Sequence, residues 1–507
     1  MSAAEPAELA ALRARFAELS DLQGVASLLN WDQQTMMPPR GMAVRAERSA
    51  SLDRVIHARI TDPELGRLLD ALAPWEAGED PDSDAASLVR LARRDHEKAV
   101  RVPAELSAAM VRASSLGTEA WLTARQSSDF SPFREALERH LELRHRYIAC
   151  FEGFEHPYDV LLDDFEPGMR TAEVVPVLAE LRTGLAPLVA AAAREGRPHN
   201  DGVLDGAYAV EDQRAAVLDV LGGVGFDPAG WRLDPAPHPF ASGMGAGDIR
   251  ITTRYDEREL GMALFSALHE FGHGLYDSGA ASGALARTTL DAPASLAIHE
   301  SQSRLWENLV GRGRPFCAWV LPRLQRTLGG LDGLTADRLF EGVNAVSRSL
   351  IRVEADETTY NLHIVLRFEL ELALIEGRLA VADLPAAWNE RMASDLGVEV
   401  PDDASGVLQD IHWGAGALGY FSTYTLGNLV AAQLWERIRT DLPDLDERIE
   451  TGDFAPLRAW LHEHIHRHGR KFEGRDLLRR VTGQPLSAQP FLAYLRAKLL
   501  DAGALTA

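Results

Sequence analysis

The chain has 507 residues, of which 46% are hydrophobic and 25% are charged, the balance of an ordinary soluble globular protein. Its 75 acidic residues outnumber its 52 Lys and Arg residues, and the formal net charge is −23. So acidic a surface repels polyphosphate and anionic lipid, and we expect neither nucleic acid nor a membrane as a partner. The chain has two cysteines and no signal-peptide pattern at its N-terminus, which predicts a cytoplasmic protein.

Apolar residues recur at the spacing of an α-helix through most of the chain. This spacing predicts amphipathic helices over 7–19, 84–100 and 133–154. Polar segments predict connections between helices at 74–84 and 194–207.

A Pro- and Gly-rich segment interrupts the helical pattern at 226–256. Within it, residues 248–255 alternate apolar and polar side chains, which predicts the only clear strand. Helix is predicted again over 257–276, and the run 338–376 contains no proline and predicts one long helix. We therefore expect a mainly α protein with a small sheet just before the helix at 257–276.

That helix carries the sequence HEFGH, which suggests a metal site. His269 and His273 are four residues apart, so both imidazoles lie on one helix face and can bind one ion. Glu270 lies on the adjacent edge, where it can hold a metal-bound water instead of the metal itself. The pattern also arises by chance in long helical proteins, so these five residues alone leave open two ordinary histidines beside a solvated glutamate.

A zinc site needs at least one more protein ligand. The extended pattern HExxHxxGxxH is absent, because Tyr276 and Gly279 stand where it requires Gly and His. A carboxylate on the next helix is the other common solution, and Glu300 is 31 residues beyond the first histidine. His299 and Glu307 are further candidates, and spacing does not choose among the three.

Six motifs, in order along the chain, resemble those of the M32 family of metallocarboxypeptidases, the thermostable carboxypeptidase Taq group. HEFGH and HESQSR (299–304) are similar to the family's metal motifs. The others are the HPF, DxRxT, IRxxAD and GxxQDxHW patterns, at 238–240, 248–252, 351–356 and 406–413. The family's N-terminal pattern LxWDxxTxMP is also present, in LLNWDQQTMMPP. The resemblance covers nearly the whole chain.

The resemblance implies a zinc carboxypeptidase that releases single C-terminal residues from peptides with a free C-terminus. It implies that His269, His273 and Glu300 bind zinc and that Glu270 is the general base for the attacking zinc-bound water. Cobalt or manganese could also occupy such a site. The resemblance further implies a homodimer and a helical fold with two lobes and a deep active-site groove.

We expect the chain to form one peptidase unit with four parts. These are a helical lobe (1–225), a loop and strand region (226–256), a core with the metal and substrate sites (257–430) and C-terminal helices (431–507).

Peptide hydrolysis also needs donors that stabilise the oxyanion. The candidates are His412 and a tyrosine of the segment GALGYFSTYTLG, with Tyr420 ahead of Tyr424, which is also a candidate substrate contact. Each tyrosine is equally well explained as a packed aromatic residue with a satisfied hydroxyl.

A carboxypeptidase must bind the terminal carboxylate of its substrate, which the planar fork of an arginine does well. Arg352 is the first candidate because the resemblance includes IRxxAD in the substrate-binding set, and Asp356, one turn later, would orient it. Spacing alone favours an ordinary helix salt bridge between the two. Arg250 is the second candidate, and Asp248 beside it on the strand is also a candidate substrate contact; the alternative role of Arg250 is to shape the cleft. His238 would contact substrate or brace its loop.

Two further patterns have competing interpretations. Asp277, four residues beyond His273, is a candidate partner for an imidazole or a cap at the helix end. Residues 414–419 match GxGxxG, but no βαβ pattern surrounds them, so we expect small residues that let the chain pass close to a substrate backbone. Two other functions remain open: an oligoendopeptidase with the same zinc site, and a silent peptide-binding scaffold with a structural metal.

Overall fold

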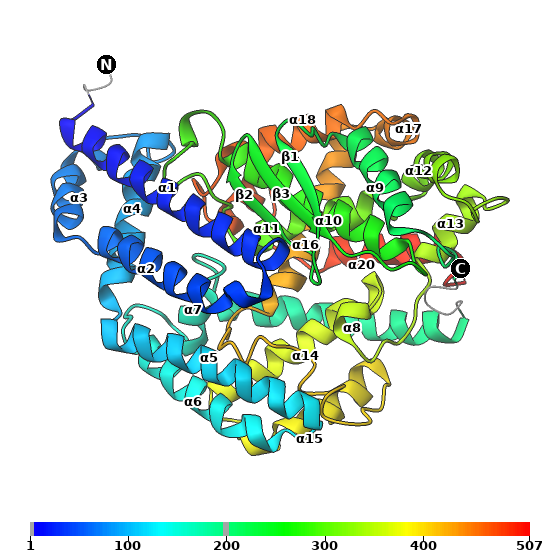
Figure 1. The fold of residues 1–507 in the computed structure, drawn as a ribbon, viewed down its shortest axis with the longest axis horizontal. Helices are drawn as coiled ribbons and strands as arrows, with labels where there is room; N and C mark the ends of the chain where they lie inside the picture. Colours follow the sequence, from blue (N-terminus) through cyan, green and yellow to red (C-terminus); the bar gives the residue numbers. More distant parts are fainter. Residues whose placement is uncertain (1–4, 196–201, 507) are drawn as a thin grey trace.

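The computed structural model describes residues 5–195 and 202–506, and helices make up most of it (Figure 1). The mainly α fold predicted from the sequence is confirmed. The helices of the first half are α1 (Ala7–Thr35), α2 (Met42–Ile60), α3 (Pro63–Glu76), α4 (Asp84–Arg101), α5 (Ala104–Ser127), α6 (Ser131–Ile148), α7 (Pro157–Leu162), α8 (Thr171–Glu195) and α9 (Val210–Val224).

All three predicted early helices are present, although two of them have different ends. The first continues as α1 to Thr35, and the third ends as α6 at Ile148, before the predicted 154. Of the predicted connection at 194–207, residues 196–201 lie outside the described residues.

Helix α8 is long and apolar enough to cross a membrane over Thr171–Ala193, and 28% of its most apolar window is buried. Its apolar residues are not distributed evenly. Leu178, Leu181 and Leu185 are at most 1% exposed and belong to a core that includes residues of α14 (Glu357–Ile375), on which α8 packs. This spacing of three and four residues is that of a helix with one buried face.

The sheet has three strands, β1 (Trp231–Pro235), β2 (Ala241–Gly245) and β3 (Asp248–Thr253), in the order β1-β3-β2. The predicted strand is β3, the central one, and its Ile249 and Ile251 are fully buried. It pairs parallel to β1 and antiparallel to β2, both within the segment predicted as a loop. In Figure 1 the sheet lies in front of helix α10 (Gly261–Ala280), which packs on β2 and β3.

Helix α1 is joined to this sheet through Trp31, which is 4% exposed. The guanidinium groups of Arg232 on β1 and Arg250 on β3 lie 4.9 and 4.5 Å from the centre of a Trp31 ring. These cation–π contacts, together with the packing of α1 on β2, attach the N-terminal helices to the region that precedes the HEFGH helix.

The helices of the second half are α10, α11 (Leu296–Arg304), α12 (Arg314–Thr327), α13 (Ala336–Val343), α14, α15 (Leu384–Arg391), α16 (Ser422–Asp441), α17 (Leu445–Thr451), α18 (Ala455–His464), α19 (Gly474–Thr482) and α20 (Gln489–Asp501). Two large hydrophobic cores lie in the upper right and the lower part of Figure 1 and are called here the upper and lower cores, and α1, α3 and α4 enclose a smaller core at the upper left. Helix α16 contributes Leu434 to the upper core and Leu426 to the lower, and it packs on α11, so it joins these two cores beside the HESQSR segment.

The prediction of one long helix over 338–376 is wrong. Helix α13 ends at Val343, residues 345–349 have no regular structure, and α14 begins at Glu357 after a short 3₁₀ turn over Arg352–Glu354. Asp356 caps α14 by accepting hydrogen bonds from the backbone N–H groups of Thr358 and Thr359. A capping aspartate favours a helix start, which the absence of proline does not reveal.

Candidate active site

The HEFGH segment lies in the middle of α10. The apolar side of this helix packs into the upper core, and Leu264, Leu268 and Phe271 are at most 2% exposed. His269 and His273 are one turn apart, and their ring centres are 4.9 Å from each other. Both histidines therefore project from one face, as the spacing predicts.

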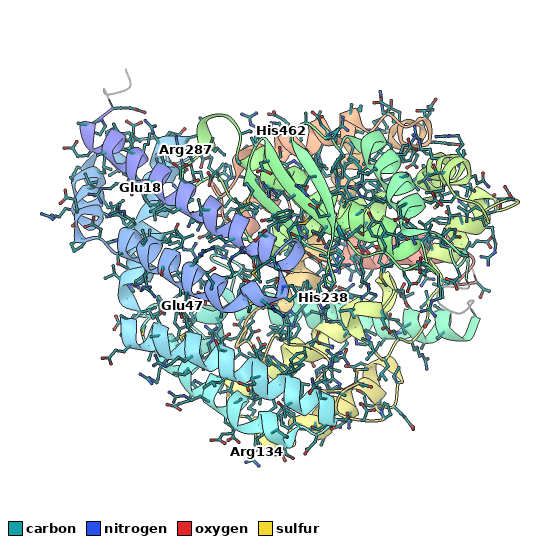
Figure 2. The ribbon with its side chains drawn as sticks, in the orientation of Figure 1. Glu18, Glu47, Arg134, His238, Arg287 and His462 are labelled. Atoms are coloured by element: carbon teal, nitrogen blue, oxygen red, sulfur yellow. The ribbon has the colours of Figure 1, made fainter. Side chains whose placement is uncertain are left out.

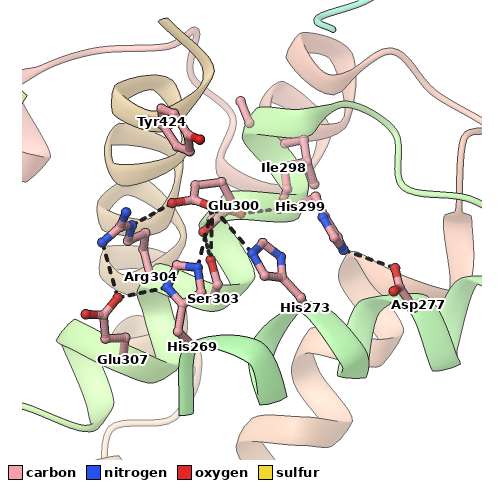
Figure 3. A network of polar contacts seen from close by, with 12 residues as sticks. His269, His273, Asp277, Ile298, His299, Glu300, Ser303, Arg304, Glu307 and Tyr424 are labelled. Atoms are coloured by element: carbon pink, nitrogen blue, oxygen red, sulfur yellow. Dashed lines mark hydrogen bonds and ion pairs between the residues drawn. The ribbon is translucent and has the colours of Figure 1, made fainter. Parts of the chain in front are cut away.

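Glu300 on α11 faces these two histidines (Figure 3). Its Oε2 lies 3.4 Å from His273 Nε2 and 3.8 Å from His269 Nε2. One ligand atom from each residue lies within 4.8 Å of the others. The structure thus brings His269, His273 and Glu300 into one group, called here the metal cluster.

The metal cluster fits a divalent ion. Ligand atoms about 2.0–2.1 Å from a tetrahedral ion lie roughly 3.4 Å from one another, close to the separations between Glu300 and the histidines. Burial lowers the pKa of His273 to about 3, so this imidazole is neutral, as a ligand must be. Burial alone would raise the pKa of Glu300, but the charges of Arg304 and His269 hold it well below its usual range.

A second layer of side chains surrounds the metal cluster. Arg304 donates hydrogen bonds to Glu300 at 2.7 Å and to Glu307 at 3.2 Å, and Glu307 Oε2 lies 2.8 Å from His269 Nδ1. Burial alone would raise the pKa of Glu307, but Arg304 and His269 lower it to about 2, so its carboxylate is charged. A carboxylate on the outer nitrogen of a histidine fixes the ring and leaves the other nitrogen for a metal.

The other candidate ligand, His299, has a different contact. Its Nε2 lies 3.0 Å from Asp277 Oδ1, and its ring lies against that of His273, tilted by 33°, with centres 4.1 Å apart. Asp277 therefore orients an imidazole, as one interpretation of the sequence holds, but the imidazole is that of His299 and not a member of the metal cluster.

Glu270 is 5% exposed and follows His269 directly on α10. Burial raises its pKa to about 7; the charge of His269 acts to lower this pKa, and that of Glu300 acts to raise it. A carboxyl group with a pKa near neutrality can both accept and return a proton, which is what a general base in hydrolysis must do.

His412, Tyr420 and Tyr424 are close together. The Tyr424 hydroxyl lies 3.2 Å from His412 Nε2, and the rings of Tyr420 and Tyr424 are 5.3 Å apart. Tyr424 is in the first turn of α16, just before Gly427, where an added Cβ would lie 2.6 Å from Glu300 Cβ. This close approach of α16 to Glu300 brings Tyr424 beside the metal cluster (Figure 3).

Arg352 is 8% exposed and does not pair with Asp356, so that prediction is wrong. Its Nε and Nη2 donate to Asp410 Oδ1 at 2.9 and 2.7 Å, and its Nη1 donates to the Tyr360 hydroxyl at 3.1 Å. Asp410 also accepts a hydrogen bond of 2.6 Å from Arg367. Asp356 is used as the cap of α14, and the arginine lies in a short 3₁₀ turn, so the one-turn helical spacing does not apply.

The structure does not group His238, Asp248 and Arg250 with the metal cluster. Arg250 donates two hydrogen bonds of 2.8 Å to Asp248 on the same strand, and its guanidinium lies over Trp31, 4.5 Å from a ring centre. His238 lies in an exposed turn between β1 and β2, labelled in Figure 2, and makes no hydrogen bond or ion pair within 5–195 and 202–506.

The GxGxxG segment at 414–419 contacts the protein's own helix α6. His140 Nε2 lies 3.0 Å from the Gly414 carbonyl oxygen, and Arg144 donates to that of Gly416 at 2.6 Å. The small residues thus let the chain pass close to α6.

A cavity of ≈ 590 Å³ lies between helices α12, α16 and α20. Phe316, Trp435 and Lys498 are among its lining residues, and no residue proposed for catalysis lines it. The predicted active-site groove is a different feature and stays a prediction.

Sequence reasoning missed four residues of these networks: Arg304, Tyr360, Arg367 and Asp410. Arg304 lies four residues after Glu300, a helical spacing that could have revealed it. Asp410 is 58 residues from Arg352, and no local signal connects them.

Comparisons with known proteins agree with this geometry. The sequence model of the family "Carboxypeptidase Taq (M32) metallopeptidase" matches residues 11–499. Thermostable carboxypeptidase 1 of Thermus thermophilus is 42% identical over 490 residues, which cover 95% of this chain and 96% of the relative. Carboxypeptidase 1 of Bacillus subtilis is 36% identical over 482 residues, 95% of each chain.

Solved structures show the same likeness. The crystal structure of the M32 carboxypeptidase from Deinococcus radiodurans R1 has a TM-score of 0.95 and 39% sequence identity, covering 99% of this chain and 100% of the other. The chain therefore belongs to the M32 family of metallocarboxypeptidases, and it is a peptide hydrolase of the metal-dependent class.

Proposed function

We propose that this metallocarboxypeptidase uses zinc in the metal cluster to release single residues from peptides with a free C-terminus. The observation that supports this is the closeness of the metal cluster to a buried arginine. Glu300 packs against α16, and the guanidinium of Arg352 lies 5.4 Å from the ring centre of Tyr424 on that helix. A site for an anion thus adjoins a site for a hydrolytic metal.

In this proposal Arg352 binds the terminal carboxylate of the substrate. Its Nη1 and Nη2 each carry two N–H groups, and one on each nitrogen is used by Tyr360 or Asp410. The two that remain form a fork for a carboxylate. Asp410 and Tyr360 fix the orientation of this fork before substrate arrives.

The other residues of the site each have a separate role in hydrolysis. His269, His273 and Glu300 would hold the metal, which when bound polarises the scissile carbonyl and lowers the pKa of a bound water to roughly 7. Glu270 accepts the proton of the attacking water and returns it to the leaving amine. The hydroxyls of Tyr420 and Tyr424, with His412, donate hydrogen bonds to the oxygen on which negative charge develops.

Zinc is proposed because two imidazoles and one carboxylate are a common ligand set for it, and cobalt or manganese remain alternatives. We also propose a cytoplasmic homodimer without nucleic-acid or membrane partners, from the acidic composition and the family resemblance. Light scattering of the purified chain measures its oligomeric state.

The test compares two peptides that are blocked at the N-terminus and differ only at the C-terminus, one a free acid and the other an amide. Metal content is measured on the same sample. We expect stepwise loss of single residues from the acid alone, observed by mass spectrometry. Equal cleavage of both peptides with internal fragments would favour an oligoendopeptidase, and bound metal without hydrolysis of a broad peptide panel would favour a silent scaffold.

A further inference from the structure

Glu371 on α14 is a buried carboxyl group that the chemistry above does not use. Its side chain is fully buried, and no ion pair to it is present in the described part of the chain. Burial raises its pKa, and three hydrogen bonds oppose that effect. Oε1 accepts from the Tyr158 hydroxyl at 2.6 Å and from the backbone N–H of Gly419, and Oε2 accepts from Trp413 Nε1 at 2.9 Å.

Two of these three donors belong to the segment 404–421, which has no helix or strand. Trp413 follows His412 directly, and Gly419 precedes Tyr420 directly. One carboxyl group therefore holds the chain immediately beside both of the residues proposed as oxyanion donors. Side chains of α6 also hold this segment, at Gly414 and Gly416, whereas Glu371 binds the residues next to His412 and Tyr420. Such bonds matter because turns fix side chains less precisely than a helix does.

The segment is tightly packed where Glu371 holds it. Gly419 has a φ of +94°, and an added Cβ there would lie 2.6 Å from the Leu161 carbonyl oxygen. Leu161 belongs to α7, the helix that also carries Tyr158, the third donor to Glu371. Glu371, α7 and the 404–421 segment thus form one continuous contact.

We propose that Glu371 is a positioning residue for peptide hydrolysis, whose carboxylate fixes His412 and Tyr420 beside the metal cluster by binding Trp413 and Gly419. This inference rests on the proposed function, because it assumes that His412 and Tyr420 act on the substrate. Glu371 itself touches neither the substrate nor the metal ligands, so it acts entirely through its two neighbours in the segment.

The carboxylate is suited to this task because it has only acceptors, and all three partners can donate to it. In Glu371→Gln the side chain keeps its volume, but one oxygen becomes an NH₂ group. That group must face either the Trp413 indole N–H or the Gly419 N–H, so at least one donor of the segment loses its acceptor. The expected consequence is a displaced segment within an otherwise intact fold.

The kinetic prediction separates turnover from binding. We expect Glu371→Gln to lower kcat about 10- to 100-fold, since small misplacements of reacting groups have effects of this size. KM should stay within about threefold, because Asp410, although it belongs to the same segment, is held by the two buried arginines Arg352 and Arg367 and precedes the residues that Glu371 binds. Metal content should be unchanged. A merely structural defect would lower the active fraction or raise KM as well.

Two matched variants extend the test to the partners of Glu371. Trp413→Phe and Tyr158→Phe each remove one donor and keep an aromatic ring, but only Trp413 adjoins His412. We expect a loss in kcat for Trp413→Phe and a change within about threefold for Tyr158→Phe. The loss for Glu371→Gln combined with Trp413→Phe should be smaller than the product of the single losses, because both remove the same contact.

Each outcome decides one of the two proposals. If the wild-type chain is active and Glu371→Gln keeps its kcat, the positioning role is wrong and the proposed function stands. If the wild-type chain hydrolyses no peptide, the proposed function fails, and hydrogen exchange then tests the contact itself. Faster exchange over 412–420 in Glu371→Gln than in the wild type, with unchanged exchange over 269–273, would support the contact. Equal exchange over 412–420 in Glu371→Gln and the wild type would overturn it.

Discussion

The metal cluster and the Arg352 site adjoin each other but are built in different ways. His269 and His273 belong to one helix, and Glu300 follows on the next, so the cluster joins two elements that are consecutive apart from a short 3₁₀ turn. Arg352 instead obtains its geometry from Asp410, Tyr360 and, through Asp410, from Arg367. Helical spacing explains the first arrangement, whereas only the tertiary fold explains the second.

The difference shows where each region is vulnerable. Ligands of the metal cluster are fixed by α10 and α11, and the bonds from Arg304 and Glu307 refine their orientation. The Arg352 site depends on a charge balance in which two buried arginines share one carboxylate, Asp410. Burial alone would raise the pKa of Asp410, but Arg367 and Arg352 hold it well below its usual range. Removing either side of such a balance leaves a buried charge without a partner.

The largest effect is expected beside the metal cluster, from Glu270→Gln. The amide cannot accept the proton of the attacking water, so kcat should fall about 10²- to 10⁴-fold. Metal content, measured by atomic absorption, should be unchanged, because Glu270 is not among the three grouped ligands. Retained turnover would remove Glu270 from the role of general base.

Glu307→Gln tests whether the second layer matters to the metal cluster. The variant weakens the contact with His269 Nδ1 and removes the charge that Arg304 shares, so metal affinity should fall about 10- to 100-fold. Competition with a chelator measures it. Glu436→Gln, an exposed glutamate of α16, is the control and should bind metal as the wild type does. Equal affinity in the two variants would show that α10 and α11 alone define the cluster.

Arg352→Lys addresses the proposed binding of the substrate carboxylate. Lysine keeps the charge but lacks the planar fork, so KM for a peptide with a free C-terminus should rise about 10- to 100-fold. A hydrogen bond to a charged group usually contributes about this factor to binding. Steady-state kinetics provides the measurement. Arg348→Lys changes an exposed arginine in the same connection and should leave KM within about twofold. A rise of the same size in both variants would point to a general effect of this segment on binding.

The sequence therefore predicts the metal cluster better than the Arg352 site, for a physical reason. The spacing of His269 and His273 defines a face, and the motif resemblance selects Glu300 from the three candidates that spacing leaves open. In contrast, no local signal in the sequence shows that Arg352 pairs with the distant Asp410 and not with Asp356, one helical turn away. The missed strands β1 and β2 have a similar cause, since their residues pair with β3 and not with their own neighbours in sequence.

Asp356→Ala tests this last distinction and should have the smallest effect. In the structure Asp356 caps α14 and accepts a hydrogen bond from the Ser347 N–H, and Arg352 pairs with Asp410. Loss of a helix cap should lower the free energy of unfolding by about 1 kcal/mol, measured in urea, and leave KM within about twofold. If Asp356 instead orients Arg352, as helical spacing suggests, KM would rise toward the value of Arg352→Lys. The variant thus separates a residue that stabilises a helix from one that binds substrate, although both belong to one six-residue motif.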